Sequence, residues 1–338
     1  MMKKSGWNEW SLLAWMLPAL SKRQGARVLI GPGDDAAVIQ GSRCSSVSTT
    51  DALVEGTHFQ LSWQKDLSAP WRSKFWRSLG WKSLAVNLSD LAAMGNVQPL
   101  WALVTAGFPP ALDVRYIEDI YRGLKQAAGK FQVSVVGGDT VRSRTLFLSV
   151  ALTGELRSSR ALLRSGARAG DILAVTGHLG EARAGLELLK TGSTLRRPWQ
   201  RILADRFFFP TPRMKEGRAL GTSPGVGALM DVSDGLWRSL EIFSEASKVG
   251  YHVDVERLPL SSSLRRWARE KNVEPGSWAA AGGEDYELLF SCRPEVVRIL
   301  RRHFSFTEVG RVTGASHGRQ LCRQGKPLTK LPVFEHFS

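Results

Sequence analysis

The first half of the chain alternates short β-type runs with helical stretches. Runs rich in β-branched residues are bounded by turn residues, and between them apolar side chains recur at the three- and four-residue spacing of a helix. The predicted strands are residues 28–30, 37–39, 46–50, 100–106, 133–136 and 146–153, and the predicted helices are residues 82–94 and 114–131. This order predicts an α/β unit.

A second unit follows. It opens with a predicted strand at residues 172–176, the turn Gly177-His178-Leu179-Gly180 and a helix at residues 181–189. A chain of 338 residues with 43% hydrophobic content can bury two such cores. We therefore predict an N-terminal domain of residues 1–154 and a C-terminal domain of residues 155–338.

The amino-terminal segment has a faint likeness to a secretory signal. Lys3 and Lys4 precede an apolar run at residues 11–20, but Asn8 and Glu9 interrupt the approach and no small-residue cleavage site follows. This pattern favours an amphipathic helix that docks on the body of the protein. No stretch reaches the roughly 18 consecutive apolar residues of a membrane span, so we expect no membrane partner.

The net charge and the cysteines exclude few possible partners and compartments. A formal charge of +15 suits nucleic acid, a membrane surface or a polyanionic small substrate. Because the basic residues are scattered or paired without interleaved aromatics, we expect a solvated surface and no nucleic-acid partner. A nucleic-acid-binding protein is the alternative from another class, and its affinity would fall steeply with salt. Three distant cysteines, Cys44, Cys292 and Cys322, favour a reduced, cytoplasmic setting.

Five short motifs place aspartates among small residues, where a turn or the end of an element presents a side chain. Composition alone does not explain them, because the chain is basic. Three motifs follow β-type runs, so we expect Asp51, Asp139 and Asp231 at strand ends, where α/β proteins build ligand sites. The motifs are Gly33-Asp34-Asp35-Ala36-Ala37, Ser48-Thr49-Thr50-Asp51, Asn87-Leu88-Ser89-Asp90, Gly137-Gly138-Asp139-Thr140 and Asp231-Val232-Ser233-Asp234-Gly235.

Each motif also has a purely structural interpretation. Ser233 or Asp234 precedes a helical run and could serve only as its N-cap. Asp34 and Asp35 could be ordinary turn residues. Any one motif alone favours the structural interpretation, whereas five together favour a shared site.

The predicted helix at residues 82–94 carries a polar stripe. Ser83, Asn87 and Asp90 recur at helical spacing beside a stripe of leucines, so they should line the edge of the core. No Lys or Arg lies three or four residues from Asp90, and a hard cation is therefore its natural partner. Oxygen ligands suit Mg²⁺, which shares itself with substrate phosphates.

Phosphate-binding features are less specific. The turn Gly177-His178-Leu179-Gly180 joins a strand to a helix and could offer backbone amides to an anion. Arginines that precede it could clamp phosphate oxygens. The chain has no Walker loop, no protein-kinase signature and no convincing nucleophile triad. The arginines are Arg142, Arg144, Arg160 and Arg164.

Taken in order, these motifs resemble those of the thiamine-monophosphate kinase family, from about residue 9 to residue 336. The matching segments are Gly33-Asp34-Asp35-Ala36-Ala37-Val38, Thr49-Thr50-Asp51-Ala52-Leu53-Val54-Glu55-Gly56-Thr57-His58-Phe59, Ala85-Val86-Asn87-Leu88-Ser89-Asp90-Leu91-Ala92-Ala93-Met94-Gly95, Gly137-Gly138-Asp139-Thr140, Leu163-Arg164-Ser165-Gly166-Ala167, Asp231-Val232-Ser233-Asp234-Gly235-Leu236, Gly282-Gly283-Glu284-Asp285-Tyr286-Glu287-Leu288 and Phe334-Glu335-His336-Phe337.

The resemblance implies the two-domain α/β (α+β) fold of the aminoimidazole ribonucleotide synthetase superfamily. In that fold the N-terminal domain carries a mixed sheet and pairs in a homodimer. The implied activity is the ATP-dependent phosphorylation of thiamine monophosphate to thiamine diphosphate, the final step of that cofactor's synthesis.

The resemblance also implies roles for individual residues. The implied ligands of several Mg²⁺ ions are Asp35, Thr49, Thr50, Asp51, Asp90, Asp139, Asp231 and Asp234. The implied ATP contacts are Gly138, Asp139, Arg164 and Ser233. The implied substrate contacts are His58, Glu284 and Phe334, the last at a position where the family commonly has Tyr or Trp.

The implied chemistry needs no catalytic general base. The acceptor is a phosphate monoester whose second pKa, near ~6, leaves it largely dianionic at neutral pH. We therefore expect direct in-line transfer without a phosphoenzyme. Within the superfamily, aminoimidazole ribonucleotide synthetase, selenophosphate synthetase and the hydrogenase maturation dehydratase are the alternatives. The last two fit less well, because no reactive Cys precedes Cys44 and the chain ends in His336-Phe337-Ser338.

Overall fold

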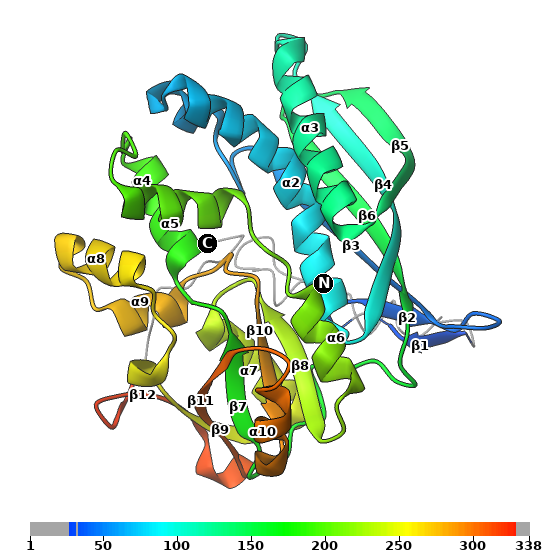
Figure 1. The fold of residues 1–338 in the computed structure, drawn as a ribbon, viewed down its shortest axis with the longest axis vertical. Coiled ribbons are helices and arrows are strands. Elements are labelled where there is room, and N and C mark those ends of the chain that lie inside the picture. The colour runs from blue at the N-terminus through cyan, green and yellow to red at the C-terminus, as the bar shows by residue number, and fades with distance from the viewer. Residues whose placement is uncertain (1–26, 32, 329–338) are drawn as a thin grey trace, which may run out of the picture.

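Two mixed β-sheets with helices packed against them make up the protein (Figure 1). The computed structural model describes residues 27–31 and 33–328, so the helix expected at residues 11–20 lies outside the described residues. The α/β class predicted from the sequence is confirmed. Among the helices described, none is both long and apolar enough to cross a membrane.

The first sheet has the strand order β1-β2-β3-β6-β4-β5. Only β4 and β5 run parallel, and the other neighbours are antiparallel. Two long helices, α2 and α3, lie side by side against this sheet (Figure 1). The elements are β1 Val28–Ile30, β2 Ala37–Ile39, β3 Ser46–Val54, the short 3-10 helix Leu61–Asp66, α2 Ala69–Ala93, β4 Val97–Phe108, α3 Val114–Phe131, β5 Ser134–Arg142 and β6 Phe147–Leu156.

The second sheet has the order β13-β12-β9-β11-β7-β10-β8, in which only β9 and β12 run parallel. Its strands are β7 Ile172–Thr176, β8 Val226–Val232, β9 Gly250–Asp254, β10 Glu287–Cys292, β11 Phe306–Thr313, β12 Arg319–Arg323 and β13 Lys326–Pro327. The helices of this half are α4 Glu181–Lys190, α5 Pro198–Phe208, α6 Met214–Thr222, α7 Leu236–Ser247, α8 Ser262–Lys271, α9 Pro275–Ala281 and α10 Val297–Leu300.

Helix α2 begins well before the position that the sequence predicted. It starts at Ala69, with Pro70 in its first turn, and not at Lys82. From Gly80 to Ser89 every residue is buried, because α2 contacts β3 and β6 of the first sheet and also α6 and β8 of the second. This later part of the helix has no amphipathic period, but Trp71, Phe75 and Leu79 of its first turns are buried at helical spacing between more exposed residues, so the pattern there did carry a signal for the earlier start.

Helices α2 and α3 approach so closely that only glycine fits at the crossing. A Cβ atom at Gly80 would lie 1.8 Å from the carbonyl oxygen of Ile120, and one at Gly123 would lie 1.8 Å from that of Arg77. Backbone atoms cannot move aside as a flexible side chain can, so these glycines set the distance between the helices.

We expect Gly80→Ala to lower the free energy of unfolding by about 1–3 kcal/mol, the usual cost of overpacking a rigid contact. Gly129→Ala is the matched control: Gly129 lies in α3 with no atom within 4 Å of an added Cβ. There the substitution should raise stability by about 0.5–1 kcal/mol, because alanine favours a helix. Urea unfolding of both variants measures the difference, and equal effects would contradict this helix packing.

Candidate metal and phosphate site

Three aspartates from three distant parts of the chain meet between the two sheets. Asp35 follows β1, Asp90 lies in the last turn of α2, and Asp231 lies near the end of β8. One carboxylate oxygen from each lies within 4.8 Å of the others. The side chain of Asp35 is fully buried and residue Asp231 is 3% exposed.

Hydroxyl groups on neighbouring elements hold two of these carboxylates. Thr49 Oγ1 of β3 donates to Asp90 Oδ2 at 2.6 Å, and Ser89 Oγ of α2 donates to Asp231 Oδ2 at 2.7 Å. Two consecutive residues of α2 therefore contact different strands: Asp90 accepts from Thr49 of β3, and Ser89 donates to Asp231 of β8. This arrangement fixes both carboxylates on rigid elements.

Arg164, one of the four arginines singled out in the sequence, pairs with a member of this cluster. Its Nη2 donates to Asp35 Oδ1 at 2.7 Å, while its backbone amide donates to both carboxylate oxygens of Asp34, at 3.3 and 3.2 Å. Asp34 also accepts a hydrogen bond from the amide of Asp35. Asp34 thus has the backbone-holding role of a turn residue, whereas Asp35 points into the cluster.

The charges of the cluster oppose one another. Burial, and then the charges of Asp51, Asp231 and Asp35, raise the pKa of Asp90 well above its ordinary value. Burial and Asp35 raise the pKa of Asp231 to about 8, although Ser89 and Arg164 lower it in part. Without a cation these carboxyl groups retain protons at pH values where exposed aspartates are ionised.

One buried oxygen in the cluster has no hydrogen-bond partner among the described residues. It is Asp35 Oδ2, whose sister atom pairs with Arg164. A buried carboxylate oxygen without a donor is costly, unless a cation lies next to it. The cluster therefore has the donor chemistry of an oxygen-ligand metal site.

Two of the three expected strand-end positions are wrong. Asp231 does lie near the end of β8, but Asp51 lies within β3 and Asp139 within β5. Asp51 is close enough to raise the pKa of Asp90 and Asp231 through its charge. Because side chains alternate along a strand, Thr49 and Asp51 share the face toward α2, whereas Thr50 faces away and its hydroxyl donates to the carbonyl of Val150.

Gly138 and Asp139 lie away from the cluster, on the exposed edge strand β5. Asp139 is paired in register with Thr105, which is exposed between the buried Val104 and Ala106. By strand alternation, Asp139 therefore faces the side of the sheet opposite α2. A register shift between Ala102 and Leu103 sets this orientation, and a sequence does not reveal such a bulge.

The interpretation of Ser233 and Asp234 as N-caps is wrong. Helix α7 has Gly235 at its N-cap and no side-chain cap hydrogen bond. The Ser233 carbonyl instead accepts from the Glu284 amide at 2.6 Å, and the charge of Asp234 helps to raise the pKa of Tyr286. Nothing in the sequence indicated a role for Tyr286, although this residue lies within one of the matching segments.

The phosphate-binding role considered for the turn before α4 is also wrong. The amides of Gly180 and Ala182 donate to the carboxylate of Asp285, at 2.6 and 3.2 Å. The Asp285 carboxyl group therefore already occupies these amides of the helix N-terminus. Of the other arginines, Arg160 donates to the Val226 carbonyl, and Arg142 and Arg144 are exposed.

Glu284 forms a partly buried ion pair with Lys82 of α2, the helix that packs against the first sheet. Lys82 Nζ of α2 lies 2.7 Å from Glu284 Oε1 and 3.9 Å from the ring centre of Phe207. Glu284 has a positive φ of 65°, in a loop tied to Ser233. Sequence reasoning missed Lys82, because several basic residues precede it in the same helix and nothing in the sequence marks it as the one that is buried.

His58 and Lys82 share a small pocket with aromatic side chains. The imidazole Nδ1 of His58 accepts from the Val54 amide at 3.0 Å, so the ring is fixed in orientation. Phe334, the third implied substrate contact, lies outside the described residues. The pocket is lined by Leu53, His58, Phe59, Phe75, Ser78, Leu79, Lys82, Phe207 and Phe208.

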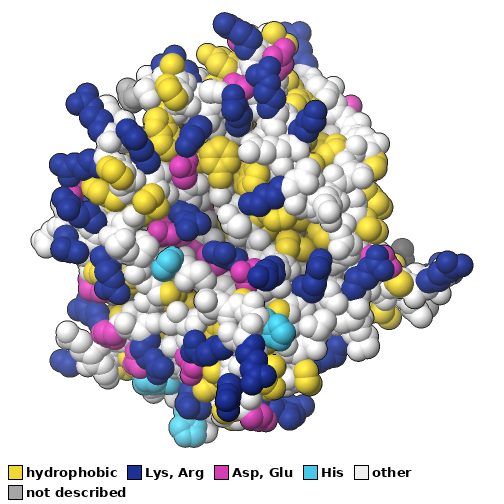
Figure 2. Space-filling view, viewed as in Figure 1, with side chains coloured by type: hydrophobic (Ala, Val, Ile, Leu, Met, Phe, Trp, Pro, Cys, Tyr) yellow, Lys and Arg dark blue, Asp and Glu magenta, His cyan; other side chains and the backbone are white. Residues whose placement is uncertain are grey.

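Basic side chains cover much of the surface without forming one continuous patch on the face shown in Figure 2. Hydrophobic and acidic side chains lie among them on that face. This distribution agrees with the solvated surface expected from the sequence.

Comparisons with known proteins place these features in context. A family model described as AIR synthase related protein, N-terminal domain, matches residues 33–156. The thiamine-monophosphate kinase of Aquifex aeolicus is 36% identical over 83% of this chain and 85% of its own length, and that of Salmonella typhimurium is 35% identical over 91% and 92%. A solved structure described as AaThiL complexed with AMPPCP and TMP covers 100% of this chain and 99% of its own, with a TM-score of 0.85 and 32% identity.

Neutralising one member of the cluster should stabilise the metal-free protein. Because the folded-state pKa values are raised, the folded state holds more protons than the unfolded state, and stability falls as pH rises from about 4 to about 8. Asp90→Asn keeps an acceptor for Thr49 and removes one charge. At pH 8 we expect it to unfold at a higher temperature than wild type, with a free energy of unfolding larger by about 1 kcal/mol or more.

Thermal unfolding in the presence of a chelator, at pH 5 and pH 8, measures this effect. The difference between Asp90→Asn and wild type should shrink at pH 5, because the raised pKa of Asp90 lets the wild-type carboxyl group keep its proton there at less cost relative to the unfolded state. Glu118→Gln is the control, because Glu118 is exposed on α3 and should change little at either pH. A variant Asp90→Asn that is less stable than wild type at pH 8 would show that Asp90 has a structural role.

Proposed function

Since the chain belongs to the thiamine-monophosphate kinase family, we propose that it transfers the γ-phosphoryl group of ATP to thiamine monophosphate, giving thiamine diphosphate and ADP. The observation that carries this proposal is the convergence of Asp35, Asp90 and Asp231 from both halves of the chain. The reaction brings the triphosphate of ATP close to the phosphate of the acceptor, so cations must neutralise their charges. A buried set of carboxylates is suited to bind such cations.

The residues of the cluster fit Mg²⁺. All donors are oxygens, two of the carboxylates have raised pKa values, and Asp35 Oδ2 has no other partner among the described residues. Bound Mg²⁺ would neutralise phosphate charge and align the attacking and leaving oxygens. Asp35, Asp90 and Asp231 would hold it, with Asp51 beside them. Thr49 would orient Asp90, and Asp234 would complete the set. The other two implied ligands, Thr50 and Asp139, face away from this cluster and are not assigned to it.

The side chains of this site orient the reactants, and none of them has to act as a general base. The acceptor phosphate is already largely dianionic at neutral pH, so no side chain has to remove a proton. Arg164 fixes Asp35 and lies where it can also contact a phosphate. We assign ATP contacts to Arg164 and Ser233, with direct in-line transfer and no phosphoenzyme. Gly138 and Asp139 lie away from this cluster on the edge strand β5.

The thiamine end of the substrate is assigned to the pocket beside Glu284. Its Oε1 is held by Lys82, which leaves the second carboxylate oxygen to face a positively charged ring. His58 and the phenylalanines of the pocket offer an apolar and aromatic wall. Glu284 and His58 therefore orient the substrate, together with Phe334.

We further propose a homodimer that pairs through the open face of the first sheet. Apolar side chains of β4 are exposed there, including Trp101 and Leu103 at 39% and 43%. A contiguous apolar surface of this kind marks an interface more often than a solvated face. Asp139 lies on the same face, so in the dimer it would lie at the interface. We place the protein in the cytoplasm.

Glu284→Gln tests the proposed substrate site and the function together. It keeps the shape of the side chain and removes its charge, so we expect the KM for thiamine monophosphate to rise about tenfold or more, the value of a charge-assisted hydrogen bond. The KM for ATP should change less than about twofold, because the nucleotide lies at the other end of the site. The assay follows thiamine diphosphate formed from MgATP and thiamine monophosphate.

The control is Glu295→Gln, an exposed residue that should leave both constants unchanged. Absence of thiamine diphosphate with the wild-type protein would overturn the proposed function itself. If Glu284→Gln raises both KM values equally, the function stands but Glu284 is not a substrate contact.

Leu103→Glu should convert the dimer to a monomer, because it places a charge on the apolar face that we assign to the interface. Sedimentation velocity should give about twice 37.3 kDa for wild type and 37.3 kDa for the variant. Val114→Glu is the control: Val114 is an exposed apolar residue at the start of α3, 63% exposed, and its replacement should leave the dimer intact. A monomeric wild type, or a dimeric Leu103→Glu, would contradict the proposed interface.

A further inference from the structure

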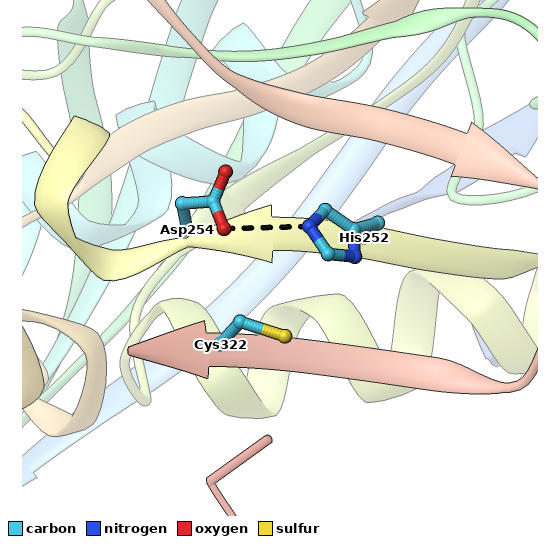
Figure 3. A group of neighbouring side chains, drawn as sticks. All are labelled: His252, Asp254 and Cys322. Atoms are coloured by element: carbon cyan, nitrogen blue, oxygen red, sulfur yellow. Dashed lines mark ion pairs between the residues drawn. The ribbon is translucent and has the colours of Figure 1, made fainter. Parts of the chain in front are cut away.

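A second group of possible metal ligands lies near the opposite edge of the second sheet. Figure 3 shows His252 and Asp254 on β9 and Cys322 on the neighbouring strand β12. One ligand atom from each of the three lies within 4.8 Å of the others. The side chains of His252 and Asp254 are 46% and 33% exposed, so solvent ions can reach them.

The parallel pairing of β9 and β12 brings these side chains together. In the register, His252 lies beside Gln320 and Asp254 beside Cys322. Side chains two residues apart point to the same face of a strand, so the four residues form one square on that face. Neighbouring strands fix this arrangement more rigidly than a loop would.

The hydrogen bonds of Gln320 determine which nitrogen of His252 can bind a cation. Gln320 Nε2 donates to the His317 carbonyl at 3.4 Å, which leaves Gln320 Oε1 to face His252 Nδ1 at 3.2 Å. An amide oxygen can only accept, so Nδ1 carries the proton. In the neutral ring, Nε2 then presents its lone pair.

That lone pair faces an anion. His252 Nε2 lies 3.3 Å from Asp254 Oδ1, with the Cys322 side chain beside them (Figure 3). Two acceptors at this distance repel each other unless a proton or a metal cation lies between them. A cation bound by both atoms and by the sulfur of Cys322 would relieve this contact.

The chemistry of the three donors distinguishes this group from the aspartate cluster. Thiolate, imidazole and carboxylate together suit Zn²⁺ and related transition metals, whereas Mg²⁺ takes oxygen ligands. The two groups are also well separated: Asp231 is on β8, four strands from β9 in the sheet, or roughly 19 Å at the usual strand spacing.

We propose that His252, Asp254 and Cys322 form a binding site for Zn²⁺ or a similar transition metal, with Gln320 as the residue that orients His252. On binding, the Cys322 thiol loses its proton to solvent and the sulfur becomes a ligand. The site links β12, and with it the β12–β13 hairpin, to β9. A fourth position remains for water or another ligand, as three-ligand sites usually have.

Cobalt titration of the full-length protein at pH 8 tests the proposal. Co²⁺ bound to a thiolate gives a charge-transfer absorption that a site of oxygen ligands does not give. We expect this absorption to saturate at one Co²⁺ per chain and to disappear when Zn²⁺ is added. Zn²⁺ should also raise the unfolding temperature of the wild type.

Four variants define the ligands. Cys322→Ser should abolish the absorption, and His252→Ala, at an exposed residue whose loss should not disturb folding, should weaken Co²⁺ binding at least as much as Gln320→Ala. Gln320→Ala should weaken it about ten- to hundredfold, the usual effect of removing a residue that orients a ligand. Cys44→Ser is the control, since Cys44 is an exposed cysteine outside the group.

Absence of the absorption in the wild type, or its survival in Cys322→Ser, would overturn the proposal. Kinase activity of His252→Ala should equal that of wild type. Failure of the proposed kinase function would leave this result untouched, because the absorption is measured without substrates.

Discussion

The repulsion among buried carboxylates is the constraint on which the rest of the structure depends. Asp35, Asp90 and Asp231 place oxygens within 4.8 Å of one another in a region largely shielded from water. Burial and mutual charge raise the pKa values of Asp90 and Asp231, so the cluster is stable only with protons or with cations. A site that needs cations is a site that can bind polyphosphate, and this links the stability of the fold to its proposed chemistry.

Helix α2 makes this arrangement possible, because it is packed against both sheets. Through Asp90 it reaches Thr49 of the first sheet, and through Ser89 it reaches Asp231 of the second. About two turns earlier, Lys82 of the same helix pairs with Glu284. Metal cluster and substrate pocket are therefore positioned by one rigid element, and the glycine contacts with α3 hold that element in place.

The pattern of apolar and polar residues along the chain predicted some of these features but not others. The bounds of α3 follow from its amphipathic period, and the polar stripe of Ser83, Asn87 and Asp90 correctly placed Asp90 beside the core. The start of α2 was missed although Trp71, Phe75 and Leu79 have helical spacing; only the part from Gly80 to Ser89, which is buried on all sides, lacks a period. The Lys82–Glu284 pair joins residues 202 positions apart, and the face on which Asp139 lies depends on a β-bulge, so neither could be predicted from spacing along the chain.

Binding of Mn²⁺, a paramagnetic substitute for Mg²⁺, tests the central claim most directly. Electron paramagnetic resonance measures the free Mn²⁺ that remains when protein and the non-hydrolysable nucleotide AMPPCP are added together. If the aspartate cluster holds metal and phosphate jointly, wild-type protein should remove Mn²⁺ from solution far more strongly with AMPPCP than AMPPCP alone, and Asp231→Asn should lose most of that effect. Equal depletion of free Mn²⁺ by wild type and Asp231→Asn would contradict the account.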